Sequence, residues 1–471
     1  MTKFLDLINQ LVWGLPALGL ILGVGIHLSV RTHWIQFKLF PRAVKSFCSQ
    51  MLRNKSDKGI SSYGALCTAL SATVGTGNLA GVAGAIAIGG PGAVFWMWIC
   101  AILGMVTKFA EATLSVHYRK MEADGSYTGG PMYIVRAHLP KRWQPLAIVY
   151  CFFGVVAAFG VGSATQVNAA IGGINGAILA GGGENSPVRN LLIGLIFAAV
   201  MLPVLLGGAN RISSVASFVV PFASLFYMIL CFGILVYKFS AIPNALLDII
   251  YGAFCPRAVT GGVLGSAFQA LRIGASRGVF TNEAGMGTAG IAHASAHVRH
   301  PVQQGLMGIM EVFLDTIVIC TMTALVILCS GISIPYGNDL GIEITAEAFA
   351  SVYGRWVYTP LAISLCCFAI ATVFGWGLYG ANCAKFLFGK SAWKFFVIFQ
   401  TVSVIVGAIM NTGTVWMLAE TANGLMAIPN LIILTYCVPE LVKLIHSYQN
   451  LIGTKAAVGG TNENFNQCKP V

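Results

Sequence analysis

SATVGTGNLAG, at residues 71–81, is the stretch that decides how this chain is expected to fold. It lies inside an apolar segment, 64–88, that is about long enough to cross a bilayer. A glycine destabilises a helix interior by about 1 kcal/mol relative to alanine, and unpaired backbone is not tolerated against lipid. Gly75, Gly77 and Asn78 therefore predict a helix that is broken in mid-membrane beside a protected cavity. The exposed helix ends would offer amide and carbonyl poles, which suit a carboxylate and a cation.

The same glycines also allow a simpler interpretation. Gly77 and Gly81 form a GxxxG pair, a common pattern that lets two spanning helices approach each other closely. In that case the helix would be continuous, and its small residues would serve packing instead of binding. The residues of this stretch leave both interpretations open.

The composition places the chain among membrane proteins. Of its 471 residues, 56% are hydrophobic and only 9% are charged, and the mean hydropathy is +0.78. Repeated apolar runs of this kind predict an all-α polytopic membrane protein. The 13 cysteines are scattered without CxxC spacing, which indicates small apolar side chains and not a metal site. The net charge of +12 follows from the distribution of bases between loops, so no nucleic-acid partner is expected.

Gly, Pro and Asn clusters divide the apolar runs into about eleven predicted membrane spans. These cover residues 11–30, 64–88, 93–116, 146–175, 190–207, 213–237, 260–295, 303–330, 359–384, 395–411 and 415–441. The 260–295 segment is too long and too polar for one plain helix. A basic, partly amphipathic segment, 31–58, follows the first span, and 331–358 is expected to be an external loop with a short helix.

The basic residues predict the orientation in the membrane. Most of the 28 Lys and Arg fall on the side that carries 31–58, 117–145 and the C-terminal tail, which is the positive-inside pattern. The N-terminus is therefore expected outside and the C-terminus in the cytoplasm, in a bacterial-type cell (inner) membrane. The first span is not interpreted as a cleavable signal, because 11–30 is too long and lacks a small-residue cleavage site.

The remaining ten spans divide into two halves of five helices, which therefore run through the membrane in opposite directions. Each half opens with a glycine-interrupted segment, the second one at Gly274, Gly278, Gly285 and Gly287. Inverted halves with broken first helices are typical of secondary transporters with a midplane site. The expected units are an extra N-terminal helix with its basic segment (1–63), a first repeat (64–238), an external connection (239–259), a second repeat (260–441) and a cytoplasmic tail (442–471).

Few charged residues lie inside the predicted spans, and each one needs a partner or a cavity. Lys108 and Glu111 lie three residues apart near the end of their helix, so we interpret them as a structural ion pair. Such a pair neutralises both charges without any role in binding.

Glu311 and Asp315 lie four residues apart on one face of the 303–330 helix. Two carboxylates at this spacing repel each other, so a base, a cation or a proton must offset them. Arg272 and Arg277 are the nearest bases inside the spans along the sequence. We therefore expect a network that ties this helix to the broken helix, with an ion site as the alternative.

No pattern in the sequence indicates an enzyme. His293 and His297 have HxxxH spacing, but Ala294 stands where a zinc protease needs its glutamate, so we interpret both as interfacial histidines. The chain has no GxSxG elbow and no GxxxxGK[ST] loop for a nucleotide. Transport would then have to be driven by an ion gradient, and no cofactor is expected besides a coupling ion.

Four blocks of sequence resemble signature blocks of the alanine or glycine:cation symporter family. They are ALCTALSATVGTGNLAGVAGAIAIGGPGAVFWMW (65–98), RGVFTNEAGMGTA (277–289), EVFLDTIVIC (311–320) and FGWGLYG (374–380). The resemblance extends over nearly the whole chain from the first span onward. It implies the leucine-transporter fold, with two inverted five-helix repeats preceded by one extra helix. It also implies uptake of small neutral amino acids, alanine and glycine, coupled to sodium.

The resemblance further implies a set of binding residues. The unwound part of the first repeat helix would give backbone amides to the substrate carboxylate and oxygens to sodium. Thr372 matches a hydroxyl that completes a second ion site, although the neighbouring Ala371 is often another hydroxyl residue in the wider fold. The implied substrate-binding residues are Thr73, Gly75, Thr76, Gly77, Gln166, Ile273, Gly274 and Trp376. The implied sodium ligands are Ser71, Val74, Asn78 and Thr372.

A gate or network role is expected for the charged and amide residues that flank this site. They are Lys108, Glu111, Arg277, Asn282, Glu283, Glu311 and Asp315. Two rival functions remain open: proton-coupled amino-acid transport through Glu311, Asp315 or Glu283, and a sensor that binds an amino acid without moving it. The expected partners are the small-molecule substrate, sodium and the lipid bilayer, with no obligate protein partner.

Overall fold

The computed structural model describes residues 13–52, 59–256, 260, 266–338, 341–410 and 413–457, and this part is almost entirely helical. The N-terminal helices are α2 (Leu15–Arg31), α3 (Ile35–Lys38) and α4 (Phe40–Leu52). The next elements are α5 (Ser62–Thr73), η1 (Gly77–Gly81), α6 (Val82–Gly89), α7 (Gly92–His117), β1 (Lys120–Met121), β2 (Tyr127–Thr128), α8 (Pro131–His138), η2 (Lys141–Trp143), α9 (Gln144–Phe159), η3 (Gly160–Ala164), α10 (Thr165–Ala180), α11 (Pro187–Leu206) and α12 (Gly208–Tyr237).

The second half of the chain begins after a short connection. Its elements are η4 (Phe239–Ala241), α13 (Ile242–Phe254), α15 (Ala267–Asn282), α16 (Thr288–His293), α17 (Pro301–Val312), η5 (Phe313–Cys320), α18 (Thr321–Ser330), α19 (Ile342–Tyr353), η6 (Arg355–Val357), α20 (Tyr358–Phe388), α21 (Ala392–Ile409) and α22 (Gly413–Ala457). The short helix expected within 331–358 is present as α19. The antiparallel hairpin of β1 and β2 lies within 117–145, a segment for which the sequence predicted no strand.

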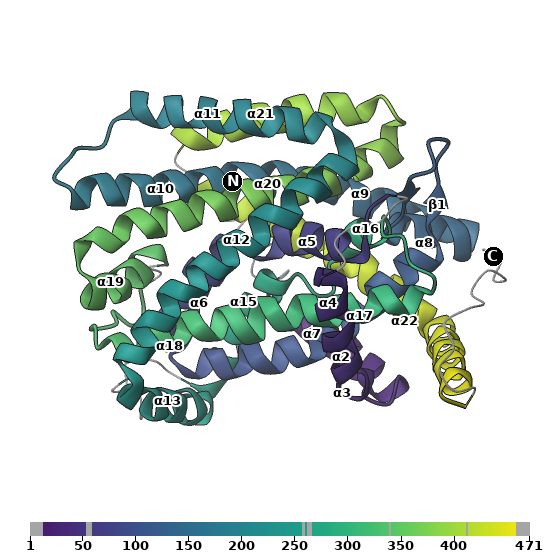
Figure 1. Cartoon of the computed structure of the whole chain (residues 1–471), viewed down its shortest axis with the longest axis horizontal. Helices are drawn as coiled ribbons and strands as arrows, with labels where there is room; N and C mark the ends of the chain where they lie inside the picture. Colours follow the sequence, from purple (N-terminus) through teal and green to yellow (C-terminus); the bar gives the residue numbers. More distant parts are fainter. Residues whose placement is uncertain are drawn as a thin grey trace.

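The long helices form two groups (Figure 1). α9, α10, α11, α20 and α21 pack together in the upper part of the view, and α7, α15 and α17 pack together in the lower part. α5 lies between the groups and contacts α12, α17 and α20, and every residue of α5 is buried. Polar groups on this helix therefore face protein and not lipid.

Eight helices in the described part are long and apolar enough to cross a membrane, and the bent pair 62–89 makes a ninth. α2, with 17 residues, and α15, with 16 residues, are shorter than the others. Each of the eleven predicted spans contains a helix at the expected place, so the helices are confirmed. The count of eleven membrane crossings stays a prediction.

The predicted break in the first repeat helix is present. α5 ends at Thr73, the chain is extended at Val74 (φ −78°, ψ 101°), and the helix that resumes after it is bent by 53°. The interpretation of Gly77 and Gly81 as a packing face of a continuous helix is therefore wrong. The reason is visible in the burial: the freed backbone lies inside the protein, where side chains can satisfy it.

The second repeat helix is also interrupted, but later than two of its glycines suggested. α15 is continuous to Asn282, and the turn follows at 283–287. Three residues of that turn have positive φ, namely Glu283 (54°), Gly285 (97°) and Gly287 (76°). Gly274 lies inside α15, where a side chain would clash with the α7 backbone at Ala93. Gly274 and Gly278 therefore permit close packing on α7 instead of breaking the helix.

Three of the spanning helices contain a π-helical turn, which accommodates an extra residue and redirects the helix face. These turns are η1 after the first break, η3 between α9 and α10, and η5 between α17 and α18. η1 and η5 contact each other. Turns of this kind occur frequently at functional sites, and here they lie in the helices that carry the candidate site.

Candidate functional site

The backbone at the first break is held by Asn78. The amide N–H of Gly75 donates to Asn78 Oδ1 at 2.8 Å, and the amide N–H of Asn78 donates to the Gly75 carbonyl at 3.2 Å. Val74, Thr76 and Asn78 are each at most 2% exposed. A ligand at this break would therefore be enclosed by protein, where hydrogen bonds are stronger than in water.

Three polar side chains converge on the same turn. Thr76 donates its hydroxyl to Gln166 Oε1 at 3.0 Å. A methyl group on Gly75 would lie only 2.8 Å from Thr372 Oγ1 and 3.7 Å from Gln166 Oε1. Gly75, Thr76, Gln166 and Thr372 are thus brought together, although they come from three helices, and their roles as ligands stay a prediction. The Thr372 hydroxyl is buried and has no hydrogen-bond partner among the described residues, so it is free to meet a ligand.

Trp376 lies one helical turn beyond Thr372 on α20. It is completely buried, and it packs against Gly162 in the π-helical turn η3 so closely that a side chain at Gly162 would clash with it. Its ring meets Tyr379 edge to face, with centroids 5.9 Å apart. The indole is therefore fixed by packing, as a rigid wall of a small pocket would have to be.

A buried carboxylate lies on the other side of Asn78. Asn78 Nδ2 donates to Asp315 Oδ1 at 2.8 Å, and the Thr316 hydroxyl donates to Asp315 Oδ2 at 2.8 Å. Asn282 Nδ2 reaches Thr316 Oγ1 at 3.3 Å, so both broken helices meet here. Asp315 is completely buried and has no basic partner in the described part of the chain. Hydrogen bonds thus tie the 303–330 helix to both broken helices, whereas Arg277, one of the two arginines expected nearby, lies 3.7 Å from Glu420.

Two more predicted site residues, the ion ligand Ser71 and the substrate-binding Thr73, lie on α5. Ser71 donates its hydroxyl to the Thr68 carbonyl at 2.7 Å and faces α20, because a methyl on Gly375 would lie 2.7 Å from its oxygen. Thr73 is buried, with its hydroxyl 3.5 Å from the Leu70 carbonyl. Both hydroxyls are thus engaged within their own helix, and their role as ligands stays a prediction.

The intramembrane ion pair is not the one expected. Lys108 Nζ binds Glu311 Oε1 at 2.8 Å, and Glu311 Oε2 contacts His293 Nε2 at 2.9 Å, with all three side chains completely buried. The predicted pair of Lys108 with Glu111 is wrong, as is the placement of His293 at an interface. Lys108 does not pair with its neighbour on the same helix, because the Glu311 carboxylate on α17 lies within 2.8 Å of it.

Glu111 instead fastens the second break. Its Oε1 accepts the amide N–H groups of Gly285 at 2.9 Å and Gly287 at 3.0 Å, and the amide of Asn430 at 2.8 Å. Asn430 also donates to the Gly285 carbonyl at 2.8 Å. A carboxylate that accepts backbone amides in this way stabilises a turn of otherwise unpaired groups.

Sequence reasoning missed two members of these networks. Asn430 lies in apolar α22, and Gln304 lies near the start of α17, where it contacts His293 Nδ1 at 2.7 Å and accepts from Ser62 at 2.6 Å. Both are amide side chains within predicted spans, where a polar group needs a partner. That signal could have identified them.

The remaining predicted residues lie away from the first break. Ile273 lies against Gly89 at the far end of α6, and Gly274 lies against α7, so their expected role in binding the substrate stays a prediction. Arg277 is 3.7 Å from Glu420, and Glu283 accepts the Thr288 hydroxyl at 2.7 Å.

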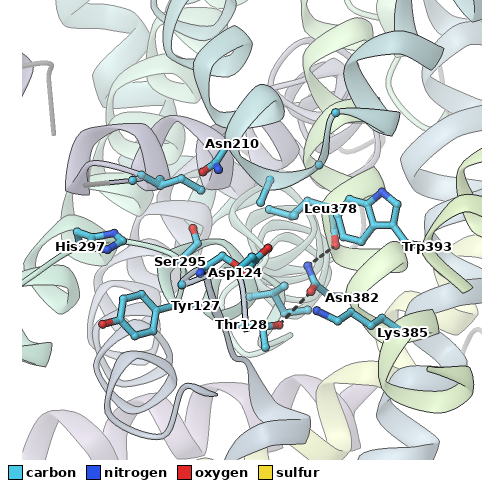
Figure 2. A pocket seen from close by; sticks show the side chains of 18 of the residues that line it. Asp124, Tyr127, Thr128, Asn210, Ser295, His297, Leu378, Asn382, Lys385 and Trp393 are labelled. Atoms are coloured by element: carbon cyan, nitrogen blue, oxygen red, sulfur yellow. Dashed lines mark hydrogen bonds between the residues drawn. The ribbon is translucent and has the colours of Figure 1, made fainter. Parts of the chain in front are cut away.

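A polar cavity of about 560 Å³ opens at the end of the molecule that carries the β-hairpin, which we call the hairpin end. Figure 2 shows Asp124, Tyr127 and Thr128 of the hairpin region around it, with Asn382 and Lys385 of α20 opposite. Thr128 donates to Asn382 Oδ1 at 3.1 Å, so the hairpin closes one side of the cavity against α20.

Charges hold the hairpin over this cavity. Glu122 is 3.1 Å from Lys385 and 3.6 Å from Lys390. Burial raises the pKa of Glu122, but the hydrogen bond from Lys385 and its positive charge lower this pKa by more than burial raises it. The pKa of Glu122 therefore lies below its ordinary value. On the other side, Arg119 stacks over the Tyr127 ring at 3.7 Å and donates to the carbonyl of Ala294, just beyond α16.

Comparison with known protein families identifies the family of this chain. The profile of the sodium:alanine symporter family matches residues 1–459. The chain belongs to the sodium:alanine symporter family. The sodium/alanine symporter AgcS of Methanococcus maripaludis is 39% identical over 436 residues, which cover 91% of this chain and 93% of that protein. The probable sodium/glutamine symporter GlnT of Bacillus subtilis is 35% identical over 430 residues, which cover 90% and 86%.

The fold of this sodium:alanine symporter family member has a counterpart among solved structures. The crystal structure of MhsT in complex with L-phenylalanine superposes with a TM-score of 0.56 at 12% identity, covering 83% of this chain and 99% of that chain. The chain therefore has the leucine-transporter-like fold that the resemblance implied. Its membership shows a transporter and not an enzyme.

Proposed function

We propose that this protein takes up small neutral amino acids such as alanine and glycine together with sodium, by alternating access. The observation that carries the proposal is the first break, where Gly75, Gln166 and Thr372 meet around a buried turn with an unpartnered hydroxyl. Family membership supports the class of transport, and the relative named for sodium and alanine supports the pairing of solutes.

The substrate would bind as a zwitterion at this turn. Its carboxylate would meet the amide end of η1, which offers a positive pole without a buried counter-charge. Its ammonium would meet oxygens such as Gln166 Oε1, which already accepts from Thr76 at 3.0 Å. Trp376, held immobile against Gly162, would limit the side chain to a small one.

Sodium is a hard cation that prefers several oxygen ligands. We place one ion beside the Asp315 carboxylate, which is buried without a basic partner in the described part and needs a positive charge. Asn78 would contribute Oδ1, which accepts the Gly75 amide in the structure, as a further ligand. A second ion would lie near Thr372, with Ser71 and the Val74 carbonyl as further ligands. Backbone carbonyls of an unwound helix supply such sites in transporters of this kind.

Alternating access requires that one end of the pathway is closed while the other opens. We place the hairpin end in the cytoplasm and the N-terminus outside, which the distribution of basic residues supports. The two inverted repeats would be 64–238 and 260–441. The hairpin, linked to α20 through Glu122 and to the end of α16 through Arg119, would then close the cytoplasmic exit.

Uptake into proteoliposomes tests the proposal. Labelled alanine and glycine should accumulate under an inward sodium gradient and should not accumulate when potassium replaces sodium. Binding of alanine without any accumulation would contradict transport and favour a sensor. A cysteine placed within 342–353 should react with a membrane-impermeant reagent in intact cells, and the opposite result would overturn the orientation.

Proton coupling is the second candidate, and one observation favours it. Asp315 receives only neutral donors in the described part, Asn78 and Thr316, so a proton would neutralise it as well as sodium would. The two ions are distinguished by the gradient that drives uptake. Accumulation under an inward proton gradient without sodium would replace sodium in the proposal.

A further inference from the structure

The segment between α2 and α5 presents an amphipathic surface that the proposed transport cycle does not use. Along α3 and α4, Ile35, Leu39 and Ala43 are at most 2% exposed and face the protein. Lys38, Arg42 and Lys45 are exposed, and their spacing of four and three residues places them on one helix face. We define the basic face as Arg31, Trp34, Phe37, Lys38, Arg42 and Lys45.

The turn that begins this surface is strained. His33 and Trp34 have φ of 54° and 57°, and Glu283 is the single other non-glycine residue with positive φ in the described ranges. A residue with a side chain pays on the order of 1–2 kcal/mol for this conformation. Buried bonds hold the turn in place: the Trp34 amide donates to the Ser29 carbonyl at 2.6 Å, and Gln36 donates to Ser29 Oγ at 2.9 Å.

The result of this turn is an exposed aromatic pair beside the bases. Trp34 is 45% exposed and Phe37 is 54% exposed, and their ring centroids lie 6.1 Å apart. A folded protein keeps such strain where the strained geometry has a use, and here it presents two apolar rings to the surroundings. Trp beside Lys and Arg is typical of segments that lie at a membrane surface.

Within the described residues, no ion pair compensates the positive charge of the basic face. Residues 7–56 contain no Asp or Glu. Within the described part of the chain, the acidic partners that form ion pairs are Glu122, Glu311, Glu420 and Glu440, and none of them pairs with Arg31, Lys38, Arg42 or Lys45. A partner of negative charge is therefore complementary to this face.

We propose that the basic face binds the phosphate headgroups of anionic phospholipids. Lys38, Arg42 and Lys45 meet the headgroups, and the rings of Trp34 and Phe37 lie at the boundary with the acyl chains. On its other side, α4 packs on α17, where Phe40 meets Phe313 edge to face at 4.9 Å. Phe313 precedes Asp315 by two residues, so lipid bound at this face restrains the element that carries the buried carboxylate.

The test measures binding of dioleoylphosphatidylglycerol to the purified full-length protein in neutral detergent, from the lipid concentration that half-saturates the rise in melting temperature. Removal of three bases in Lys38→Gln, Arg42→Gln, Lys45→Gln should weaken this binding by roughly a hundredfold. The matched control is Lys141→Gln, Arg142→Gln, Lys394→Gln, which removes three exposed bases elsewhere and should bind as wild type does. Dioleoylphosphatidylcholine should not stabilise any of the three proteins.

Two results would overturn the proposal. Equal weakening in both triple variants means a diffuse attraction to surface charge, and equal stabilisation by phosphatidylcholine means a bulk effect of lipid. A second measurement does not depend on the charge variants: brominated phosphatidylglycerol should quench less fluorescence in Trp34→Phe than in wild type. Unchanged quenching places the ring away from the lipid and contradicts the proposal. None of these results depends on whether sodium or a proton drives transport.

Discussion

The two broken helices differ in where their freed backbone groups find partners. At the second break, Glu111 and Asn430 bind the amides and a carbonyl of the turn at 283–287. At the first break, Asn78 takes one amide, and the Thr372 hydroxyl facing Gly75 has no partner within the described residues. The polar groups of the second break are thus bound by the protein itself, whereas the first break leaves a buried hydroxyl without a partner in the described part.

The glycines of the two breaks serve different purposes. Gly285 and Gly287 have positive φ, a conformation that residues with a side chain rarely adopt. Gly75 and Gly77 are not among the glycines with positive φ. Gly75 is needed for close approach, because a methyl there would lie 2.8 Å from Thr372 Oγ1, whereas at Gly77 the nearest atom would be 3.7 Å away. Similar glycine-rich sequences thus permit a close approach between helices at one break and a turn with positive φ at the other.

Removing the carboxylate of the second break should have the largest effect, and it acts on stability. Glu111→Ala leaves three buried donors without their acceptor, at about 1–3 kcal/mol for each, so we expect at least about 3 kcal/mol of lost stability. The melting temperature in detergent measures it. Glu111→Gln keeps an acceptor oxygen and should lose much less. If Glu111→Ala melts as wild type does, the second break is not held by this residue.

Adding a methyl group at the first break should instead impair alanine binding and leave the stability of the fold unchanged. Gly75→Ala places a methyl 2.8 Å from Thr372 Oγ1, so the methyl and the hydroxyl must move apart. A shift of about 1 Å at a binding site lowers activity by about a hundredfold. Sodium-driven alanine uptake measures it, with the melting temperature without ligand as the check on folding. Gly77→Ala is the matched control and should transport nearly as wild type does. Equal losses in both variants would refute the distinction between the two glycines.

A smaller effect is expected from removing the free hydroxyl alone. Thr372→Val keeps the side-chain volume and removes an oxygen that has no partner in the described part. The sodium concentration for half-maximal uptake should rise about tenfold, which is about 1.4 kcal/mol, without loss of stability. Thr372→Ser should behave as wild type. An unchanged sodium requirement in Thr372→Val would remove this residue from the ion site.

The smallest effect is expected at the hairpin, which is attached to the end of the second broken helix. Ion pairs near a protein surface are worth about 0.2–1 kcal/mol, so Glu122→Gln should speed hydrogen exchange of the 120–128 backbone by at most about fivefold. Because the pKa of Glu122 is lowered, the contact is present at neutral pH and is lost as the pH falls through that lowered pKa. The difference between wild type and variant should therefore vanish in acid.

A control keeps this last prediction specific. Glu184→Gln removes an exposed carboxylate from a distant loop and should leave exchange in the hairpin unchanged. Exchange that differs equally between wild type and variant at every pH would show that Glu122 acts through packing and not through its charge.

The membrane-buried charges show where sequence reasoning stopped. The spacing of Lys108 and Glu111 on one helix predicts an ion pair between them. In the structure, Lys108 instead binds Glu311, which is 203 residues away in the chain. The sequence predicts a network between the 303–330 helix and the broken helix with Arg272 and Arg277 as the nearest bases, but the hydrogen bond at Asp315 comes from Asn78. Local spacing reveals that a buried charge needs a partner, but only helix packing brings a particular partner within 3 Å.

The sequence by itself determined the helical spans, the class of membrane protein and the position of the first break. These depend on local properties: the length of apolar runs and the cost of glycine inside a helix. The tertiary structure decided that α15 continues to Asn282, that Gly274 packs on α7, and that Glu111 joins Asn430, 319 residues away, at the second break. Hydrogen bonds between distant helices depend on how the helices pack, and no local pattern of residues contains that information.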